Sequence, residues 1–116
     1  MNLNKLTLKT QEALQAAQQN AFENKHPQVE NEHLFSGILE VEENVLPFVF
    51  NRLKVNLSRV KSLNENILNT FSKVEGSTQN LSKSASQTLM NSINIAKNTG
   101  DEYVTVEHLL ISIFES

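Results

Sequence analysis

Two Glu-His pairs, Glu32-His33 and Glu107-His108, are the residues of this sequence whose types are best suited to chemistry. Imidazole and carboxylate groups are ordinary ligands of zinc and iron, so a metal-dependent hydrolase that uses His33, His108 and Glu107 is one hypothesis. Adjacent residues on a helix point about 100° apart, however, so a Glu-His pair cannot form one chelating face. The spacing that would do so, HExxH, does not occur. The pattern therefore favours a structural role for both histidines, and we expect no metal site.

An acidic cluster of Asp101, Glu102 and Glu107 is the other candidate for chemistry. Two carboxylates can act as acid and base when a desolvated cleft separates their pKa values. These three lie in a predicted turn and in the first turn of a helix, where capping and solvation explain them. We interpret them as polar contacts for a polypeptide or a neighbouring domain. Because the sequence also has no cysteine, nucleophile elbow or Gly-rich phosphate loop, we predict that this chain is not an enzyme and binds no cofactor.

The elements that position these residues form an internal repeat. A shift of 75 residues places Leu6–Glu40 on Leu81–Glu115, and nine of the 35 positions are identical, including both Glu-His pairs. Unrelated helical sequences would match at roughly two or three positions, so the match indicates a duplicated structural unit. Such a unit has a pseudo-twofold relation between its halves. We therefore expect a groove at the seam where the halves meet.

Apolar residues recur at three- and four-residue steps, which predicts six helices and an all-α fold. Thr7, Asn44, Asn56 and Thr105 are positioned as N-caps. The predicted helices cover about residues 8–23, 31–40, 45–53, 57–71, 82–98 and 106–114, and an exposed loop covers 72–80. The buried faces of the third and fourth helices are expected to include Leu53 and Ile67, with Asn64 interrupting the fourth.

The chain reads as a single domain, 1–116, made of two repeats at about 6–72 and 81–116. The first repeat continues past its second helix with two more helices, whereas the second stops at Ser116. We therefore interpret the second repeat as truncated and the chain as a fragment. A net charge of −3 with scattered lysines argues against nucleic acid as a partner. No apolar stretch approaches the length of a membrane span, and no signal peptide is recognisable, so we expect a cytoplasmic protein.

Several motifs in order give this sequence a family likeness. The motifs are Leu6-Thr7-x-Lys9-x-Gln11-Glu12-Ala13-Leu14, the Glu-His-Leu of each repeat, Asn44-Val45 with Phe48 and Phe50, Val74-Glu75-Gly76, and Gly100-Asp101-Glu102-Tyr103-Val104. With these motifs the sequence resembles the Clp N-terminal repeat domain, and within that family the N-terminal domain of ClpB-type AAA+ disaggregase chaperones. No single motif is specific, but their order and spacing cover essentially the whole chain.

The resemblance implies a pseudo-dimeric helical domain that captures unfolded or aggregated polypeptides. The AAA+ modules, which bind ATP and magnesium and form a homohexamer, would lie outside this chain. Family positions tied to substrate binding fall on Thr7, Asp101 and Glu107, and the apolar groove of the family would fall near Leu89, Ile95 and His108. His108 and Asn91 depart from a fully apolar groove. The alternative is adaptor docking, the role of similar domains in protease-coupled Clp ATPases.

Overall fold

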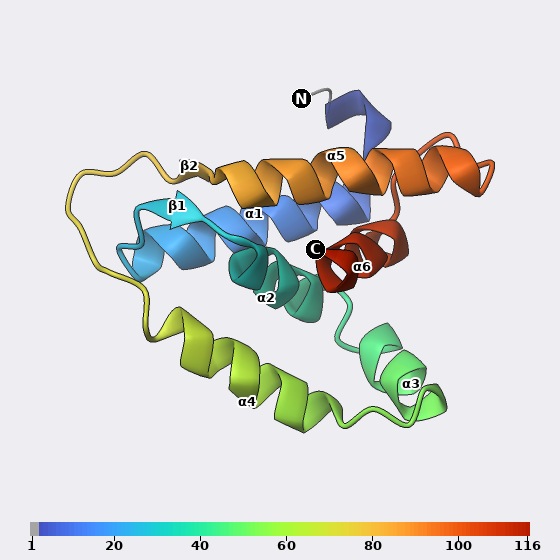
Figure 1. Ribbon diagram of the computed structural model, residues 1–116, viewed down its shortest axis with the longest axis horizontal. Helices are drawn as coiled ribbons and strands as arrows, with labels where there is room; N and C mark the ends of the chain where they lie inside the picture. Colours follow the sequence, from blue (N-terminus) through green and yellow to red (C-terminus); the bar gives the residue numbers. More distant parts are fainter. Residues whose placement is uncertain (1–2) are drawn as a thin grey trace.

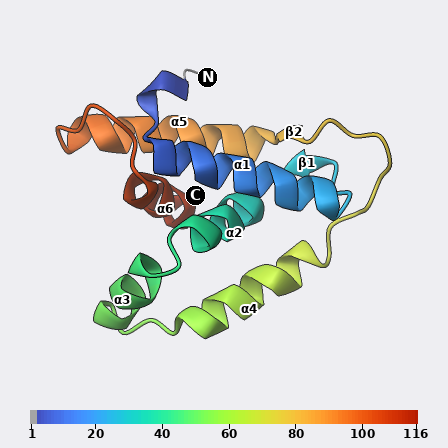
Figure 2. The same cartoon turned by 180° about the vertical axis from the view of Figure 1, so that it is seen from behind.

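The computed structural model describes residues 3–116 and contains six α-helices, as predicted. The elements are a 3₁₀ turn, η1 (Leu3–Lys5), the helices α1 (Leu8–Glu23), α2 (Asn31–Val41), α3 (Val45–Arg52), α4 (Leu57–Leu68), α5 (Lys83–Asn98) and α6 (Val106–Glu115), and two short strands, β1 (Gln28–Val29) and β2 (Asn80–Leu81). The helices α1 and α5 run antiparallel side by side, with α2 and α6 packed beneath them (Figures 1 and 2). The helices α3 and α4 extend away from this group, and a long connection returns from α4 to β2.

The two halves of the chain meet through reciprocal contacts. Strand β1 pairs with β2 in parallel, which places Val29 opposite Leu81, and an isolated bridge joins Leu6 to Val104. A shift of 75 residues converts one pair into the other. The hydrogen bonds follow the same rule, because the Thr7 amide donates to the Val104 carbonyl at 3.1 Å and the Ser82 amide donates to the Val29 carbonyl at 3.0 Å. Reciprocal contacts of this kind are the signature of a twofold relation, so the seam between the repeats is pseudo-symmetric.

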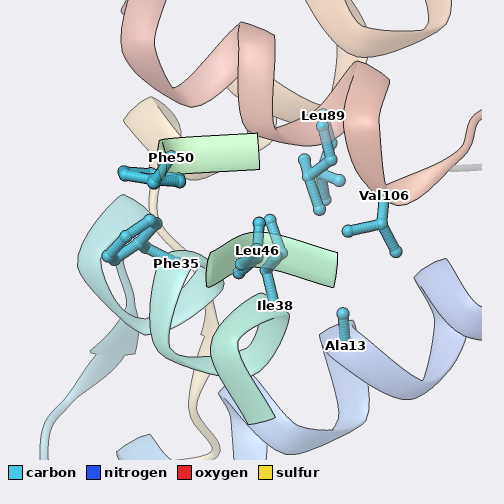
Figure 3. Close-up of a cluster of buried hydrophobic side chains, with 8 residues drawn as sticks. Ala13, Phe35, Ile38, Leu46, Phe50, Leu89 and Val106 are labelled. Carbon is cyan, nitrogen blue, oxygen red and sulfur yellow. The ribbon is translucent and has the colours of Figure 1, made fainter. Parts of the chain in front are cut away.

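The hydrophobic core draws on both repeats. Its largest cluster of buried side chains contains Ala13, Phe35, Ile38, Leu46, Phe50, Leu89, Val106 and Leu109, which come from five helices (Figure 3). The helices α1 and α2 approach closely because α1 presents alanines to α2 and because α2 contains Gly37. A Cβ atom at Gly37 would overlap the carbonyl oxygen of Ala13, so this position requires glycine for steric reasons.

Three predictions about the third and fourth helices are wrong. Leu53 is 66% exposed, because α3 ends at Arg52 and Leu53 lies at its C-terminal cap, beyond the buried Leu46 and Phe50. Ile67 is also exposed on α4. Helix α4 ends at Leu68 rather than Phe71, because the amides of Thr70 and Phe71 bond to carbonyls three residues back and tighten the chain into a turn.

Asn64, which interrupts the apolar positions of the fourth helix in the sequence, is buried in the structure. Its side-chain amide donates to the Glu32 carbonyl at 3.2 Å and to the Ser36 hydroxyl at 3.0 Å, which fastens α4 to α2. Most residues of the connection from α4 to β2 are exposed, as predicted, and one is buried. Gln79 in this connection is buried and donates to the His26 carbonyl at 3.2 Å.

Candidate binding surface

The two repeated histidines cap equivalent helices. The Glu30 amide donates to His33 Nδ1 at 2.8 Å at the start of α2, and the Thr105 amide donates to His108 Nδ1 at 2.9 Å at the start of α6. Each histidine is the third residue of its helix and takes the place that Glu or Gln holds in a usual capping box. This geometry gives the repeated Glu-His pairs a structural explanation that requires no metal.

His108 also belongs to a polar cluster in the turn between α5 and α6. Asp101 Oδ2 lies 3.0 Å from His108 Nε2 and accepts a hydrogen bond from the Thr99 hydroxyl at 2.7 Å. The Thr99 hydroxyl first, and the His108 ring second, favour the ionised carboxylate and hold the pKa of Asp101 below its usual range. Asp101 therefore presents a fixed negative charge to solvent at this turn.

Thr7 has a structural role at the start of α1. Its hydroxyl accepts a hydrogen bond from the Thr10 amide at 3.2 Å and lies 2.8 Å from the Thr10 hydroxyl, which in turn donates to the Val104 carbonyl. The predicted N-cap is confirmed. Because Val104 follows Asp101 by three residues, the structure brings the start of α1 to the α5–α6 turn. The start of α1 and the turn between α5 and α6 thus lie at the same end of the molecule (Figure 1).

Leu89 lies in the protein interior, where it cannot contact a bound polypeptide directly. Its side chain is 0% exposed and points towards Leu46, Ile38 and Val106 (Figure 3). Leu89 therefore does not line an open groove in this structure, and its role in substrate binding stays a prediction. Leu89 sits on the face of α5 that packs against α2 and α6, so the protein core uses the side chain that the family resemblance places near the groove.

The surface of α5 near the predicted groove is polar. The Asn91 amide donates to the Ser112 hydroxyl at 3.3 Å, and Ile95 is half-buried. The hollow beside Asn91 has a volume of about 270 Å³ and is lined by Ser84, Gln87, Thr88, Asn91, Ser112 and Ser116. The structure therefore does not bring Leu89, Ile95 and His108 together as one apolar surface, and their roles in binding stay a prediction.

An apolar groove of about 500 Å³ lies instead between α3 and α6. Its walls are Val45, Leu46, Val49, Phe50, Leu53, Val55, Val60, Val106, Leu110, Ile111 and Phe114, with Glu42 and Glu107 among the lining residues. Glu107, a predicted site residue, is exposed here. The side chains of Ile111 and Phe114 are 46% and 58% exposed. The sequence contained an indication of this groove, because α6 has more apolar residues than a single buried helix face can accommodate.

The internal repeat explains why this surface of α6 is apolar. On α2 the corresponding face is covered by α4, through the contacts of Asn64 with Glu32 and Ser36. A shift of 75 residues takes Glu32 to Glu107 and Ser36 to Ile111, and both of these are exposed. Within residues 3–116, therefore, the face of α6 that corresponds to the α4-covered face of α2 is exposed.

Residues 3–116 contain no group of three or more His, Cys, Asp or Glu side chains placed to hold a metal ion. The histidine nitrogens named in the hydrolase hypothesis are engaged in caps and hydrogen bonds, so that hypothesis finds no geometric support. None of the helices in the same part of the chain is long and apolar enough to cross a membrane.

Residues 5–116 match the family described as the Clp repeat (R) N-terminal domain. The chain belongs to this family. This Clp N-terminal domain is 32% identical over 113 residues to the chaperone protein ClpB of Bacteroides thetaiotaomicron and 30% identical over 120 residues to ClpB of Bacillus cereus. The matches cover 97% and 99% of the chain but only 13% and 14% of the two chaperones. The resemblance stated from the sequence is confirmed.

Solved Clp N-terminal domains share the fold. The Hsp104 N-terminal domain from Candida albicans superposes with a TM-score of 0.86 at 17% identity, covering 96% of this chain and 74% of that one. The N-terminal domain of the ClpV1 ATPase from Escherichia coli gives a TM-score of 0.87 at 22% identity, covering 98% and 70%. The all-helical Clp N-domain architecture is therefore established for this chain, whereas these low identities carry no information about its partners.

Proposed function

We propose that this Clp N-terminal domain captures unfolded or aggregated polypeptides for a ClpB-type disaggregase. Its relatedness to the N-terminal regions of ClpB chaperones supports this role. The domain would act by binding alone, and the ATP- and magnesium-dependent threading of the polypeptide would belong to AAA+ modules outside this chain. Six copies in a homohexamer would raise the effective concentration of weak sites around one aggregate.

The observation that carries this proposal is the open apolar groove between α3 and α6. Exposed apolar surface of this extent marks binding sites in soluble proteins. Two or three apolar side chains of a client would each gain about 1.5–3 kcal/mol on burial there. The entropy lost on association offsets much of that gain. The expected dissociation constant is roughly 0.1–1 mM per domain, which suits transient capture followed by transfer.

The charges around the groove favour one class of client segment. Glu42 and Glu107 lie on the groove, and the charge of Asp101 lies on the turn that leads into α6. Carboxylates at the edge of an apolar groove attract lysine or arginine and repel acidic residues. We therefore expect segments in which apolar side chains alternate with basic ones to bind best.

Adaptor docking, the alternative that the family resemblance left open, is a second candidate function, and solved domains of the same fold include one from a protease-associated chaperone and one recorded with a peptide. A similar solved structure is the N-terminal domain of the caseinolytic protease associated chaperone ClpD from Arabidopsis thaliana, with a TM-score of 0.74. Another includes a peptide from the SciI protein, at a TM-score of 0.86. A docking domain would bind one folded or peptide partner selectively, whereas a client-binding domain would bind unrelated unfolded sequences with similar affinity.

A titration of the isotopically labelled chain with a permanently unfolded protein tests the proposal. We expect amide shifts in α3 and α6 in the parent chain. The substitution Ile111→Asp should abolish them, because it places a charge in the groove. Leu63→Asp is the matched control, since Leu63 is a 53% exposed apolar residue on α4 that does not line the groove.

Equal affinity of the parent and the Ile111→Asp variant would overturn the groove assignment. Binding of only one among several unrelated unfolded proteins would support adaptor docking instead of client capture.

A further inference from the structure

A buried pair of histidines lies in the first repeat, away from the apolar groove. His26 follows α1 and is 3% exposed, and His33 in the first turn of α2 is 0% exposed. His26 Nδ1 and His33 Nε2 lie 2.7 Å apart. The ring of Phe71, from the turn after α4, packs against both imidazoles with centroid distances of 5.4 Å and 5.7 Å. The segments on either side of β1 and the turn that follows α4 therefore meet at this pair.

The hydrogen bonds fix the protons of both rings. The Glu30 amide donates to His33 Nδ1 at 2.8 Å, so this nitrogen carries no hydrogen and neutral His33 is protonated at Nε2. That Nε2–H donates to His26 Nδ1, which places the hydrogen of neutral His26 on its own Nε2. The chain of donors and acceptors runs in one direction from the Glu30 amide through both rings.

An added proton breaks this chain wherever it binds within it. On His33 Nδ1 it would face the Glu30 amide hydrogen, and on His26 Nδ1 it would face the hydrogen on His33 Nε2. Each case puts two hydrogens between nitrogen atoms that are less than 3 Å apart. Because neither contact offers an alternative acceptor, a charged imidazole is not compatible with the closed arrangement.

The surrounding charges act in the same direction. Burial lowers the pKa of His26, and the positive charge of Lys73 on the α4–β2 connection lowers it further. Burial, followed by the neighbouring His26, lowers the pKa of His33 to about 4. On the α1–β1 turn, Lys25 is paired at 2.7 Å with Glu75 of the connection. Glu30, at the N-terminus of α2, contacts the pair through its backbone amide rather than through a hydrogen bond of its carboxylate.

The pair fastens the α4–β2 connection to the rest of the first repeat. The His26 carbonyl accepts a hydrogen bond from the Gln79 side chain, and the neighbouring Lys25 carbonyl accepts one from the Val74 amide at 2.8 Å. We propose that His26 and His33 form an acid-sensitive latch, whose protonation releases residues 69–79 and uncaps α2 while the second repeat stays closed. Opening would expose Phe71 and the end of α4 near Leu68.

The equivalent histidine of the second repeat, His108, provides an internal comparison for this latch. His108 occupies the position of His33, but its Nε2 faces the Asp101 carboxylate at 3.0 Å. Its Nδ1 lies 2.9 Å from the Thr105 hydroxyl, whose oxygen can accept a hydrogen bond that the backbone amide cannot. Both ring nitrogens of His108 thus face an oxygen atom that can act as an acceptor. The equivalent histidines therefore differ in their neighbours, a carboxylate for His108 and a second imidazole for His33.

Amide hydrogen exchange at pH 7 and pH 5 tests the proposal, after correction for the known pH dependence of intrinsic exchange. A group with a pKa of 6.5 in the open state and about 4 in the closed state makes the opening constant rise as pH falls below 6.5. From His33 alone the rise is about 20-fold between pH 7 and pH 5. We expect this change at the backbone amides of His33 and Val74, which donate to the Glu30 and Lys25 carbonyls. The amides at the start of α6 should change by less than about 3-fold.

A double variant, His26→Gln with His33→Gln, removes the titration and keeps the hydrogen bonds. Glutamine at the third helical position accepts the same amide bond in a usual capping box. This variant should lose the pH dependence, whereas the matched control His108→Gln should keep it. Unchanged acid sensitivity in the double variant would overturn the latch.

If the double variant does not fold, the imidazole nitrogen shifts of the parent chain decide the question. Neutral His26 and His33 in the protected state at pH 5 would support the latch. A charged His33 with intact protection of residues 69–79 would overturn it.

Discussion

The close contact between α1 and α2 predicts that Gly37→Ala destabilises the domain. Alanine is a better helix former than glycine, so propensity alone would stabilise α2 by about 1 kcal/mol. The new Cβ, however, would overlap the Ala13 carbonyl oxygen and lie 3.1 Å from the Ala17 amide nitrogen. An ordinary carbon–oxygen contact needs about 3.3 Å, so α2 would have to move away from α1 by roughly 1 Å.

That displacement sets the size of the effect. A gap of 0.5–1 Å forfeits a quarter to a half of the dispersion energy of each contact it opens. Overpacking of a tight core costs about 1–3 kcal/mol, and we place Gly37→Ala at the upper end because the obstacle is backbone rather than a movable side chain. After subtraction of the propensity gain, the net loss is about 2 kcal/mol. With a urea m-value of about 1.5 kcal/mol/M, the midpoint should fall by roughly 1.3 M.

The assay is urea unfolding of the purified chain followed by circular dichroism, with a matched variant in the second repeat. Position 112 corresponds to Gly37, and there the Ser112 hydroxyl donates to the Thr88 carbonyl at 2.6 Å. Ser112→Ala removes one hydrogen bond and should cost about 1 kcal/mol. A Gly37→Ala variant that is as stable as the parent, or more stable, would refute the steric argument.

Two further predictions concern the residues expected to bind a client. Thr7→Ala and Ser82→Ala remove equivalent N-caps, since Thr7 accepts from the Thr10 amide and Ser82 from the Ala85 amide, and each should cost about 1 kcal/mol in urea unfolding. A Thr7→Ala variant that binds clients less well yet keeps parental stability would contradict a purely structural role. Leu89→Asp buries an unpaired charge and should cost more than about 4 kcal/mol, so helicity at 222 nm should be lost, whereas the half-buried position of Ile95 should tolerate Asp with far less damage. A folded Leu89→Asp chain would contradict the assignment of Leu89 to the core.

The repeat was the part of the fold that the sequence revealed most fully. Helical periodicity and cap residues gave six helices with ends that agree within a few residues, because these signals act over one or two turns. Wrong predictions fell where tertiary contacts override such local signals. Phe71 leaves the helical pattern of α4 to pack on two imidazoles, and Leu53 sits one residue past the end of α3.

The candidate site was harder to predict than the fold, because a groove depends on which apolar faces remain uncovered. Periodicity shows that Leu89 and Ile111 both lie on apolar faces of helices, and it does not show which face another helix covers. The structure buries Leu89 and exposes Ile111. Glu107 lies on the groove found in the structure, and the sequence indicated it in two ways, as a member of the acidic cluster and through the family resemblance.

Equivalent positions in the two repeats show what duplication preserves and what it leaves free to change. Features that hold the repeats together have been retained, since the Thr7–Val104 and Ser82–Val29 hydrogen bonds are copies of one another and both capping histidines remain. Features that face outward from a repeat have diverged, as the partners of His33 and His108 illustrate. One imidazole meets a second imidazole and the other meets a carboxylate. Because the contacts at the seam are reciprocal, a substitution in one repeat must be matched by one in the other repeat. A substitution among the residues that contact the far side of a capping histidine affects one repeat alone. Among the nine identical positions, Leu6/Leu81 and Val29/Val104 therefore mark the seam and His33/His108 mark the caps, and the two histidines differ in the group that each ring meets behind its cap.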